Sequence, residues 1–508
     1  MVDDEDASLL EVLRDRLGLR TMKDGCSPQG QCGCCTVLVD GRPRVACVTP
    51  ARRVAGREVT TADGLPVAVR ERWADAFCRE GASQCGFCTP GIIVRLAALA
   101  ATTDPTPAQV ENALLAHLCR CTGWRTILAA AGAKPGNGRP RDLAAASLRA
   151  SLEGGSPQSV GPEISLGHGG FADDSAPEDA LVAVPDGAGG WAVGETLSEA
   201  RGAAATAGKV QGRRSGAEVR HPVEVPPGDW AITLRTTWVE PAYLELDASW
   251  CRPGEEPATA LGNGGAFGGK LASPAPAVAR RLADRYGRAV RVLLSREDTV
   301  RLGAKRPPLA AGVRADGTGV VRVVRTPGIS DAIRAVAPGF EVEEADVPGP
   351  PTSVALRASG WAEALVLLAA AAGPPVRISS PSGATASASV EVDAAGWPVS
   401  VDVWLACGDP LDEVVLRSYA TGAAHMAVGW VCSEAIAVDG FGVPQDLTIR
   451  SFGILRARDT PPIEITIDRG CAHRPPVNGS DAVFAAVAAA TWMAQGVPQD
   501  WPTRRGRF

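Results

Sequence analysis

Hydrophobic and polar positions form short, regular segments over the first 60 residues. Residues 8–14 carry apolar positions at helical spacing behind a capping box from Ser8 to Glu11, which predicts a short helix. Residues 36–41 and 44–48 alternate around an Asp-Gly turn, which predicts a β-hairpin. A glycine-containing loop joins the two, so the pattern indicates a small α+β unit.

Helical spacing dominates the next segment. Apolar positions run from residue 92 to 101, and a Thr-Pro pair at 106–107 is a good cap and first turn for another helix through Leu118. Val110, Leu114 and Leu118 share one face of that helix. A four-helix bundle is the simplest fold for this segment.

The remainder of the chain changes character twice. From residue 134 it becomes rich in Gly, Pro, Ser and Ala with few periodic segments, which predicts a linker. Beyond residue 165, helical and alternating segments are mixed, which predicts a mixed α/β region without a repeat. The predicted helices there are 276–286 and 480–493, and the predicted strands are 289–295, 320–325, 387–393, 399–405, 447–455 and 463–467. The predicted domains are 1–60, 61–135, a linker over 136–164, and 165–508.

Composition and charge exclude some classes of function. The chain has 508 residues, a net charge of −6 and no basic stripe, so it lacks the electrostatic footprint that binds nucleic acid. The acidic first six residues are unlike a signal peptide, and the most apolar run, 362–373, is too short to span a bilayer and contains Glu363. We therefore expect a soluble, cytoplasmic protein that has protein and small-molecule partners and no nucleic-acid or membrane partner.

The cysteines carry the strongest chemical signal. Fourteen cysteines in a long chain without a secretory signal favour reduced thiols or metal ligands over disulfides. Eight of them fall into two frames of four, and four thiolates are what one [2Fe–2S] cluster needs. The sequence therefore predicts two [2Fe–2S] clusters and electron-transfer chemistry. The first frame is Cys26, Cys32, Cys35 and Cys47, and the second is Cys85, Cys88, Cys119 and Cys121.

Structural zinc is the alternative for such cysteines, because zinc sites also use C-x2-C pairs. Zinc motifs rarely contain a C-x-C closure such as 119–121, or a loop with glycines at 25, 30 and 33, so the cluster interpretation is favoured. The cysteines without partners at ligand spacing are interpreted as small buried residues. They are Cys78, Cys251, Cys407, Cys432 and Cys471.

Residues 25–41, 84–91 and 119–123 resemble the iron–sulfur module of the molybdenum hydroxylases, the family of xanthine dehydrogenase, aldehyde oxidase and carbon monoxide dehydrogenase. The resemblance covers about residues 7–132 and implies a β-grasp, ferredoxin-like domain followed by a helical cluster domain.

The first loop departs from the family's usual C-x4-C-x2-C, because five residues separate Cys26 from Cys32, and Cys34 stands where the family has a small residue. Either Pro28-Gln29 bulges outward, or Cys34 competes with Cys35 as a ligand. The x2 spacing is kept only with Cys35, which favours the bulge.

Later segments are similar, in the same order, to the molybdopterin-binding part of that family. Residues 264–270 are close to its GGGFGGK loop, and the resemblance implies that Gly264, Gly265, Phe267 and Gly268 contact a molybdopterin. Gln84 is implied to contact the same cofactor. The other similar segments are 171–174, 239–245, 293–298 with 305–307, 356–360 with Glu363, and 422–429.

Residues 264–270 allow two other interpretations. They fit the phosphate-loop pattern, but Leu271 stands where a magnesium-binding Ser or Thr belongs, and no helix is predicted before about residue 276. A glycine-rich surface turn is the plainer alternative.

The C-terminus departs from the family most. Where the family has Gly-x-Gly-Glu with a carboxylate as general base, this chain reads Gly479-Ser480-Asp481. Asp481 is the nearest candidate base, and the alternative is that Ser480 or Asp481 caps the last helix. Arg357 is a candidate catalytic residue by resemblance or else a plain surface arginine, and His425 is interpreted as a packed helix residue.

Two functions follow from these expectations. The leading hypothesis is an iron–sulfur component of a molybdenum hydroxylase that passes electrons from a molybdopterin site through two clusters to a flavin subunit or another acceptor. The alternative is an electron-transfer or scaffold subunit whose C-terminal half binds no molybdenum. No segment resembles the family's flavin domain, so FAD is expected only on a partner subunit, and a full-length molybdopterin subunit is a further expected partner.

Overall fold

A computed structural model describes residues 7–133, 141–206, 218–262 and 264–505. The acidic N-terminal six residues and positions 136–140 of the predicted linker lie outside this range. Among the described residues, no helix combines the length and apolar character needed to cross a membrane.

The N-terminal unit is the predicted small α+β fold. The Ser8 hydroxyl accepts a hydrogen bond from the Glu11 N–H (3.1 Å) at the start of the first helix. The hairpin forms as predicted, but Cys47 lies in a 3-10 turn after the second strand and not in the strand. The three-stranded sheet has the order β2-β1-β3, and its elements are α1 (Leu9–Glu11), β1 (Thr36–Val39), β2 (Arg42–Val45) and β3 (Val59–Thr60).

Four helices follow, as the sequence predicts, and the expected fold class is confirmed. Thr106 and Gln109 form a complete capping box at the start of the third of them. That helix is shorter than predicted, because it tightens into a 3-10 turn over Leu114–Ala116. The four helices are α2 (Val67–Arg79), α3 (Thr89–Ala100), α4 (Pro107–Ala113) and α5 (Arg125–Gly132).

The described part of the predicted linker is folded and packed. It contains α6 (Leu143–Gly154), which Asp142 caps by accepting hydrogen bonds from the N–H groups of Ala144 and Ala145. The alanine-rich sequence favours a helix once it has this cap. A short helix, α7 (Pro162–Ser165), comes next. The connection between the two halves is thus a packed helix, and the domain boundaries themselves stay a prediction.

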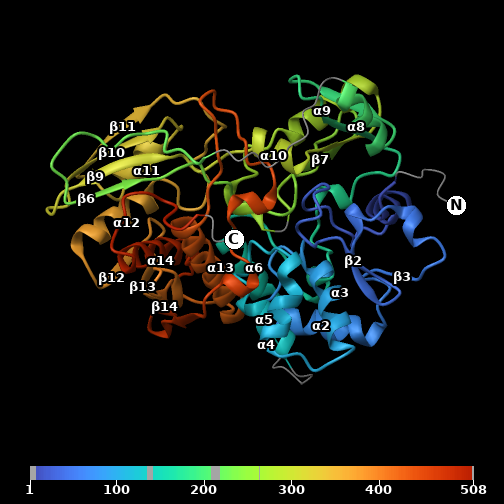
Figure 1. The fold of residues 1–508 in the computed structure, drawn as a ribbon, viewed down its shortest axis with the longest axis horizontal. Helices are drawn as coiled ribbons and strands as arrows, with labels where there is room; N and C mark the ends of the chain where they lie inside the picture. The colour runs from blue at the N-terminus through green and yellow to red at the C-terminus, as the bar shows by residue number, and fades with distance from the viewer. Residues whose placement is uncertain (1–6, 134–140, 207–217, 263, 506–508) are drawn as a thin grey trace.

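In the second half, the residues that the structure describes form three four-stranded sheets with their helices (Figure 1). In the first, of order β5-β4-β8-β7, strands β4 and β8 are parallel. In the second, of order β11-β10-β9-β6, strands β10 and β11 are parallel. The elements are β4 (Leu181–Pro185), β5 (Trp191–Gly194), α8 (Leu197–Thr206), β6 (Ile232–Arg235), β7 (Ala248–Cys251), α9 (Ala275–Tyr286), β8 (Val290–Leu293), α10 (Arg296–Leu302), β9 (Leu309–Val313), β10 (Gly319–Val324), α11 (Ile329–Arg334) and β11 (Phe340–Ala345).

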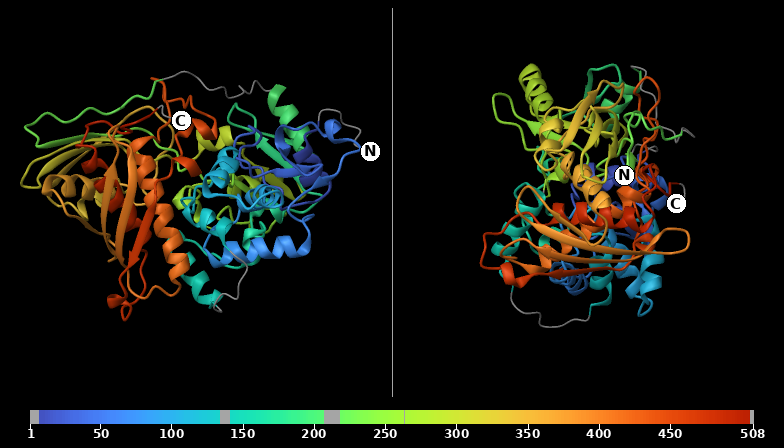
Figure 2. Two further views of the ribbon diagram at one scale, coloured as in Figure 1. Left: turned by 60° about the horizontal axis from the view of Figure 1, so that its bottom comes forward. Right: turned by 90° about the vertical axis from the view of Figure 1, so that its left-hand side faces the viewer.

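The third sheet, of order β12-β13-β14-β15, packs against two long apolar helices that form the main core. Figure 2 shows the orange helix α13 (Glu413–Cys432) between this sheet and the blue and cyan N-terminal part, and α13 also packs against α6. The remaining elements are α12 (Trp361–Ala372), β12 (Val376–Ser379), β13 (Thr385–Val392), β14 (Pro398–Ala406), β15 (Ile463–Ile467) and α14 (Ser480–Ala494).

One predicted strand, 447–455, is wrong, since this segment contains a 3-10 turn, Ile449–Phe452. Its backbone bonds to the first cysteine loop and not to a neighbouring strand. The Gln29 side-chain amide donates to Leu447 O (3.0 Å) and accepts from the Ile449 N–H (3.1 Å). Tertiary contact therefore overrides the local preference for a strand.

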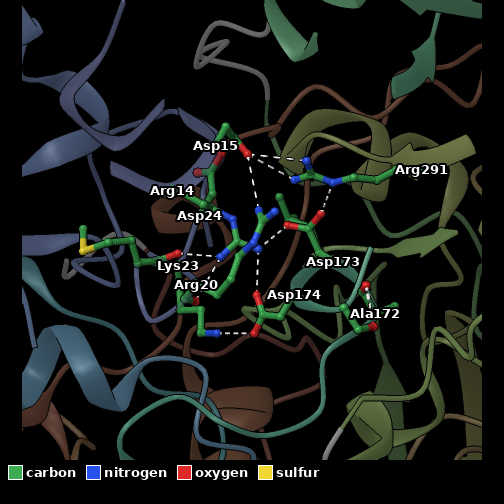
Figure 3. Close-up of polar contacts among 12 residues, drawn as sticks. Arg14, Asp15, Arg20, Lys23, Asp24, Ala172, Asp173, Asp174 and Arg291 are labelled. Atoms are coloured by element: carbon green, nitrogen blue, oxygen red, sulfur yellow. Dashed lines mark hydrogen bonds and ion pairs between the residues drawn. The ribbon is translucent and has the colours of Figure 1, made fainter. Parts of the chain in front are cut away.

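A network of charges ties the N-terminal unit to the first sheet of the second half (Figure 3). Arg14 Nη2 lies 2.5 Å from Asp173 Oδ2 and 2.7 Å from Asp174 Oδ1, while Arg291 Nε on β8 lies 2.5 Å from Asp173 Oδ1. Lys23 pairs with Asp174. Burial works to raise the pKa of Asp173, but Arg291 and Arg14 hold it well below the ordinary Asp value.

Candidate functional site

The first four predicted cluster ligands converge. We call Cys26, Cys32, Cys35 and Cys47 the first thiol set. The Cys47 thiol interacts with those of Cys26 and Cys35, and Cys26 in turn interacts with Cys32. All four side chains are buried. The loop and the 3-10 turn after the hairpin thus bring together four soft donors, as one [2Fe–2S] cluster requires.

Cys34 lies beside this set and its thiol interacts with that of Cys32, but its backbone contacts differ from those of Cys26 and Cys35. Backbone N–H groups donate to two members of the set, from Gln29 to Cys26 Sγ (3.3 Å) and from Cys47 to Cys35 Sγ (3.4 Å). Cys34 Sγ faces a backbone carbonyl, Cys32 O, at 3.9 Å. Because donors favour a thiolate and an acceptor favours a protonated thiol, these contacts support Cys35 over Cys34 as the ligand.

The second four predicted ligands form two close pairs. We call Cys85, Cys88, Cys119 and Cys121 the second thiol set. Cys85 Sγ and Cys121 Sγ are 3.7 Å apart, and Cys88 interacts with Cys119, whose sulfur also lies 3.1 Å from Thr122 Oγ1. Two thiolates at about 2.3 Å from one tetrahedral metal would be roughly 3.7 Å apart. Both the donor chemistry and this spacing fit a [2Fe–2S] cluster.

The two thiol sets are held against each other. The Leu118 N–H, next to the second set, donates to Cys32 O in the first (3.0 Å). Thr36 Oγ1 lies 3.1 Å from His117 Nε2, and burial lowers the pKa of this histidine to about 4. His117 is therefore neutral at pH 7 and serves as a packing and hydrogen-bonding residue between the sets. Sequence reasoning gave it no role.

The glycine-rich loop 264–270 has an unusual backbone. Ala266 and Phe267 both adopt left-handed conformations, with φ of 52° and 55°. Such conformations cost roughly 1–3 kcal/mol each in non-glycine residues and concentrate at functional sites. Gly268 could not be replaced easily, because a Cβ there would lie 1.9 Å from Ala355 O. The loop forms a 3-10 turn and no phosphate-loop helix follows it directly.

Arg357 and Asp481 meet at this loop. Arg357 Nε lies 3.1 Å from Asp481 Oδ1, with side-chain exposures of 6% and 27%. The Arg357 N–H donates to Phe267 O (3.1 Å), and its guanidinium lies over the Phe267 ring. Burial raises the pKa of Asp481, and Arg357 offsets part of this effect. Arg357 is thus a buried, ion-paired residue and not the plain surface arginine of the alternative interpretation.

The start of α14 is held by residues that the sequence did not indicate. The carboxylate of Glu153, at the end of α6, accepts the N–H groups of Gly479 and Ser480 (2.8 Å at the shortest) and pairs with Arg149 at 3.0 Å. Neither Ser480 nor Asp481 caps the helix with its side chain, because the N-cap position is Gly479. No sequence signal could have placed Glu153 here, more than 300 residues away.

The side chain of Gln84 forms hydrogen bonds to other residues of the chain. Its side-chain amide donates to Cys121 O and to Ser418 Oγ on α13, both at 3.0 Å. It therefore links the second thiol set to the second half of the chain. Gly264 lies close by, since a Cβ on it would be 3.2 Å from Cys85 Cβ.

The cavity at the glycine-rich loop is smaller than a typical ligand pocket. It has a volume of about 140 Å³, against roughly 300–1,000 Å³ for typical ligand pockets. Ser156 Oγ and Gln158 Nε2 are buried near the loop without a partner among the described residues. These polar atoms suit a small ligand. The cavity is lined by Glu153, Ser156, Gly265, Phe267, Arg357 and Asp481, among others.

Comparison with known proteins defines the class first. Residues 61–132 match the family described as "[2Fe-2S] binding domain", so the chain is an iron–sulfur protein. The xanthine dehydrogenase iron-sulfur-binding subunit of Escherichia coli is 39% identical over 124 residues, which are 24% of this chain and 77% of that protein. Aldehyde oxidoreductase of Megalodesulfovibrio gigas is 42% identical over 130 residues, 25% of this chain and 14% of that protein.

These relatives place the chain in a family. The chain belongs to the molybdenum hydroxylase family. A solved structure of aldehyde oxidoreductase from Desulfovibrio gigas matches with a TM-score of 0.66 at 14% identity, over 96% of this chain and 95% of that one. The second half of the chain therefore shares the fold of that protein.

Proposed function

We propose that this chain is an iron–sulfur electron-transfer subunit of a molybdenum hydroxylase, in which the second half holds the second thiol set in place. The observation that carries this proposal is the convergence of eight thiols into two adjacent sets of four. We assign the ligands to the first and second thiol sets. Electrons would pass between the clusters across the contact at Leu118 and Cys32.

Partner subunits form part of the proposal. The chain is similar to a protein named as one subunit of a xanthine dehydrogenase, which supports assembly with other subunits. We propose a flavin-binding subunit as electron acceptor and a molybdopterin subunit as donor, with a small-molecule substrate oxidised there. The Arg357–Asp481 pair and the 140 Å³ cavity support a structural role for the second half.

A second candidate is catalysis within this chain. The strained backbone at Ala266 and Phe267 and the unpartnered Ser156 Oγ favour a ligand at this loop. Asp481 would then be the candidate base in place of the family's glutamate. Turnover of xanthine or an aldehyde by the isolated chain with an artificial acceptor, abolished in Asp481→Asn, would support this candidate.

Metal analysis of the purified chain separates the two. We expect about four irons and about four labile sulfides per chain, as two [2Fe–2S] clusters require, and only traces of molybdenum. About two irons would contradict the two-cluster proposal. Molybdenum in amounts near one per chain would overturn the scaffold role and support catalysis in the second half.

A further inference from the structure

One face of helix α13 lies directly on the loop of the second thiol set. Ser418 Oγ donates to Gly81 O (2.7 Å) and accepts from Gln84 Nε2 (3.0 Å). Four residues later, a Cβ on Gly422 would lie 1.7 Å from Cys121 O. Residues four apart share a helix face, so the backbone of α13 approaches the cysteine loop too closely for any side chain at this position.

Near the C-terminal end of the same helix, the absence of a side chain at Gly429 leaves space for the carboxylate of Glu434, which follows the helix. A Cβ on Gly429 would lie 2.2 Å from Glu434 Oε1, and the Glu434 N–H donates to Gly429 O (2.8 Å). The fold thus turns back after α13 and directs the Glu434 carboxylate toward the cysteine loop.

Glu434 meets Arg120 in a two-point ion pair. Nη1 lies 2.5 Å from Oε1 and Nη2 lies 2.6 Å from Oε2, and the two side chains are 3% and 2% exposed. Arg120 Nε also donates to Pro241 O (3.0 Å). Arg120 stands between two members of the second thiol set, Cys119 and Cys121. The backbone of Arg120 therefore lies between two proposed cluster ligands, and its buried positive charge is held and balanced by one carboxylate.

The other charged groups of this region have partners of their own, so Glu434 is the carboxylate that faces Arg120. The nearby imidazole of His425 is neutral, because burial lowers its pKa to about 3. The neighbouring ion pairs are Lys305–Glu240 (2.9 Å) and Arg306–Glu363 (2.7 Å).

We propose that the Arg120–Glu434 pair sets the reduction potential of the second cluster, with Glu434 acting as a positioning residue from the second half. Reduction adds one electron to the cluster, and a nearby unbalanced guanidinium would stabilise that added charge. Glu434 cancels this effect and keeps the second cluster a stronger reductant. The inference rests on the proposed electron-transfer function and deepens it, because it gives the second half a part in that function.

The test is a potentiometric titration of the chain followed by electron paramagnetic resonance. Glu434→Gln keeps the shape of the side chain and removes its charge. We expect the midpoint potential of the second cluster to rise by about 59 mV or more, which is a tenfold change in its reduced-to-oxidised ratio, while the first cluster keeps its potential. The double variant Arg120→Gln/Glu434→Gln removes both charges and should return the potential toward the wild-type value.

Glu343→Gln serves as a control variant away from the thiol sets. It removes the carboxylate that lies 2.7 Å from Arg322 Nε, in an ion pair between β10 and β11. It should leave both potentials unchanged. A Glu434→Gln protein with both clusters at wild-type potentials overturns the proposal, and so does a shift that the two clusters share.

If the Glu434→Gln protein lacks the paramagnetic signal of the second cluster, the double variant Arg120→Gln/Glu434→Gln tests the proposal instead. Recovery of the signal at a potential near wild type supports the proposal, and continued absence overturns it. A wild-type chain that lacks the second signal would instead contradict the proposed function itself.

Discussion

The two thiol sets offer the same donors but are fastened to the molecule in different ways. The first set belongs to a unit that is tied to the second half by charges, with Asp173 between Arg14 and Arg291, and by the hydrogen bonds of Gln29 to Leu447 and Ile449. The second set is gripped by backbone contact with α13 at Gly422 and by the enclosed Arg120–Glu434 pair. The Asp173 side chain of the first attachment is 22% exposed, whereas both side chains of the Arg120–Glu434 pair are at most 3% exposed.

This difference predicts different sensitivities. Charges that water can reach are weakened by salt and by acid, whereas buried pairs are screened much less. Close-packed contacts such as the one at Gly422 leave no room for added atoms, but they do not depend on ionic strength. The first cluster should therefore respond to solution conditions, and the second to substitutions along α13.

The largest expected effect tests whether the two sets are independent. Cys119→Ser removes one ligand of the second thiol set, so we expect iron to fall from about four to about two per chain. One paramagnetic signal should vanish and the other should stay. Cys251→Ser, a change at a buried cysteine of β7 outside both sets, should keep both signals. Loss of both signals in Cys119→Ser would show that the sets depend on each other.

The next effect tests the charged attachment of the first set. Asp173→Asn leaves Arg14 and Arg291 without a shared carboxylate, and breaking such a pair should lower the free energy of unfolding by about 3 kcal/mol at pH 7. The folded pKa of Asp173 lies below its ordinary value. The contribution of ionised Asp173 to the free energy of unfolding is therefore complete above the pKa of about 3.9 that an aspartate has in the unfolded chain. This contribution is lost as the pH falls toward the lower pKa of Asp173 in the folded protein.

The stability difference between wild type and Asp173→Asn should consequently shrink below about pH 4. Denaturant titrations at several pH values measure it. Asp346→Asn is the matched control, since this aspartate pairs with Arg325 on the exposed surface and should matter little at any pH. A difference for Asp173→Asn that stays constant down to pH 3 would contradict the assignment.

Local sequence signals correctly predicted structures that are formed by residues close together in the sequence. Cysteine spacing predicted two groups of four thiols, which converge in the structure, and the Asp-Gly turn and the Thr106–Gln109 capping box predicted a hairpin and a helix that both form. The strand predicted over 447–455 failed because Gln29, more than 400 residues earlier, bonds its backbone. Local preference cannot report such a partner.

The contacts that join the halves had no local signal at all. Arg120 and Glu434 are 314 residues apart, and Glu153 reaches the start of α14 from a segment that composition alone marked as a linker. Residues of the glycine-rich loop, Arg357 and Asp481 were separate candidates by resemblance, and Gly265, Phe267 and Gly268 line one cavity with the other two. That Arg357 and Asp481 neutralise each other there could not be predicted, because pairing depends on side-chain geometry.

The smallest expected effect concerns Cys34 and sharpens the comparison at the first set. The Cys34 thiol faces Cys32 O and receives none of the backbone N–H bonds that reach Cys26 and Cys35. Cys34→Ala should therefore leave the iron content and both paramagnetic signals unchanged, whereas Cys35→Ala should remove the signal of the first cluster. Iron analysis and spectroscopy of the two variants provide the measurement. If Cys34→Ala lost the first cluster and Cys35→Ala kept it, the extra residue in the loop would have moved the ligand from Cys35 to Cys34.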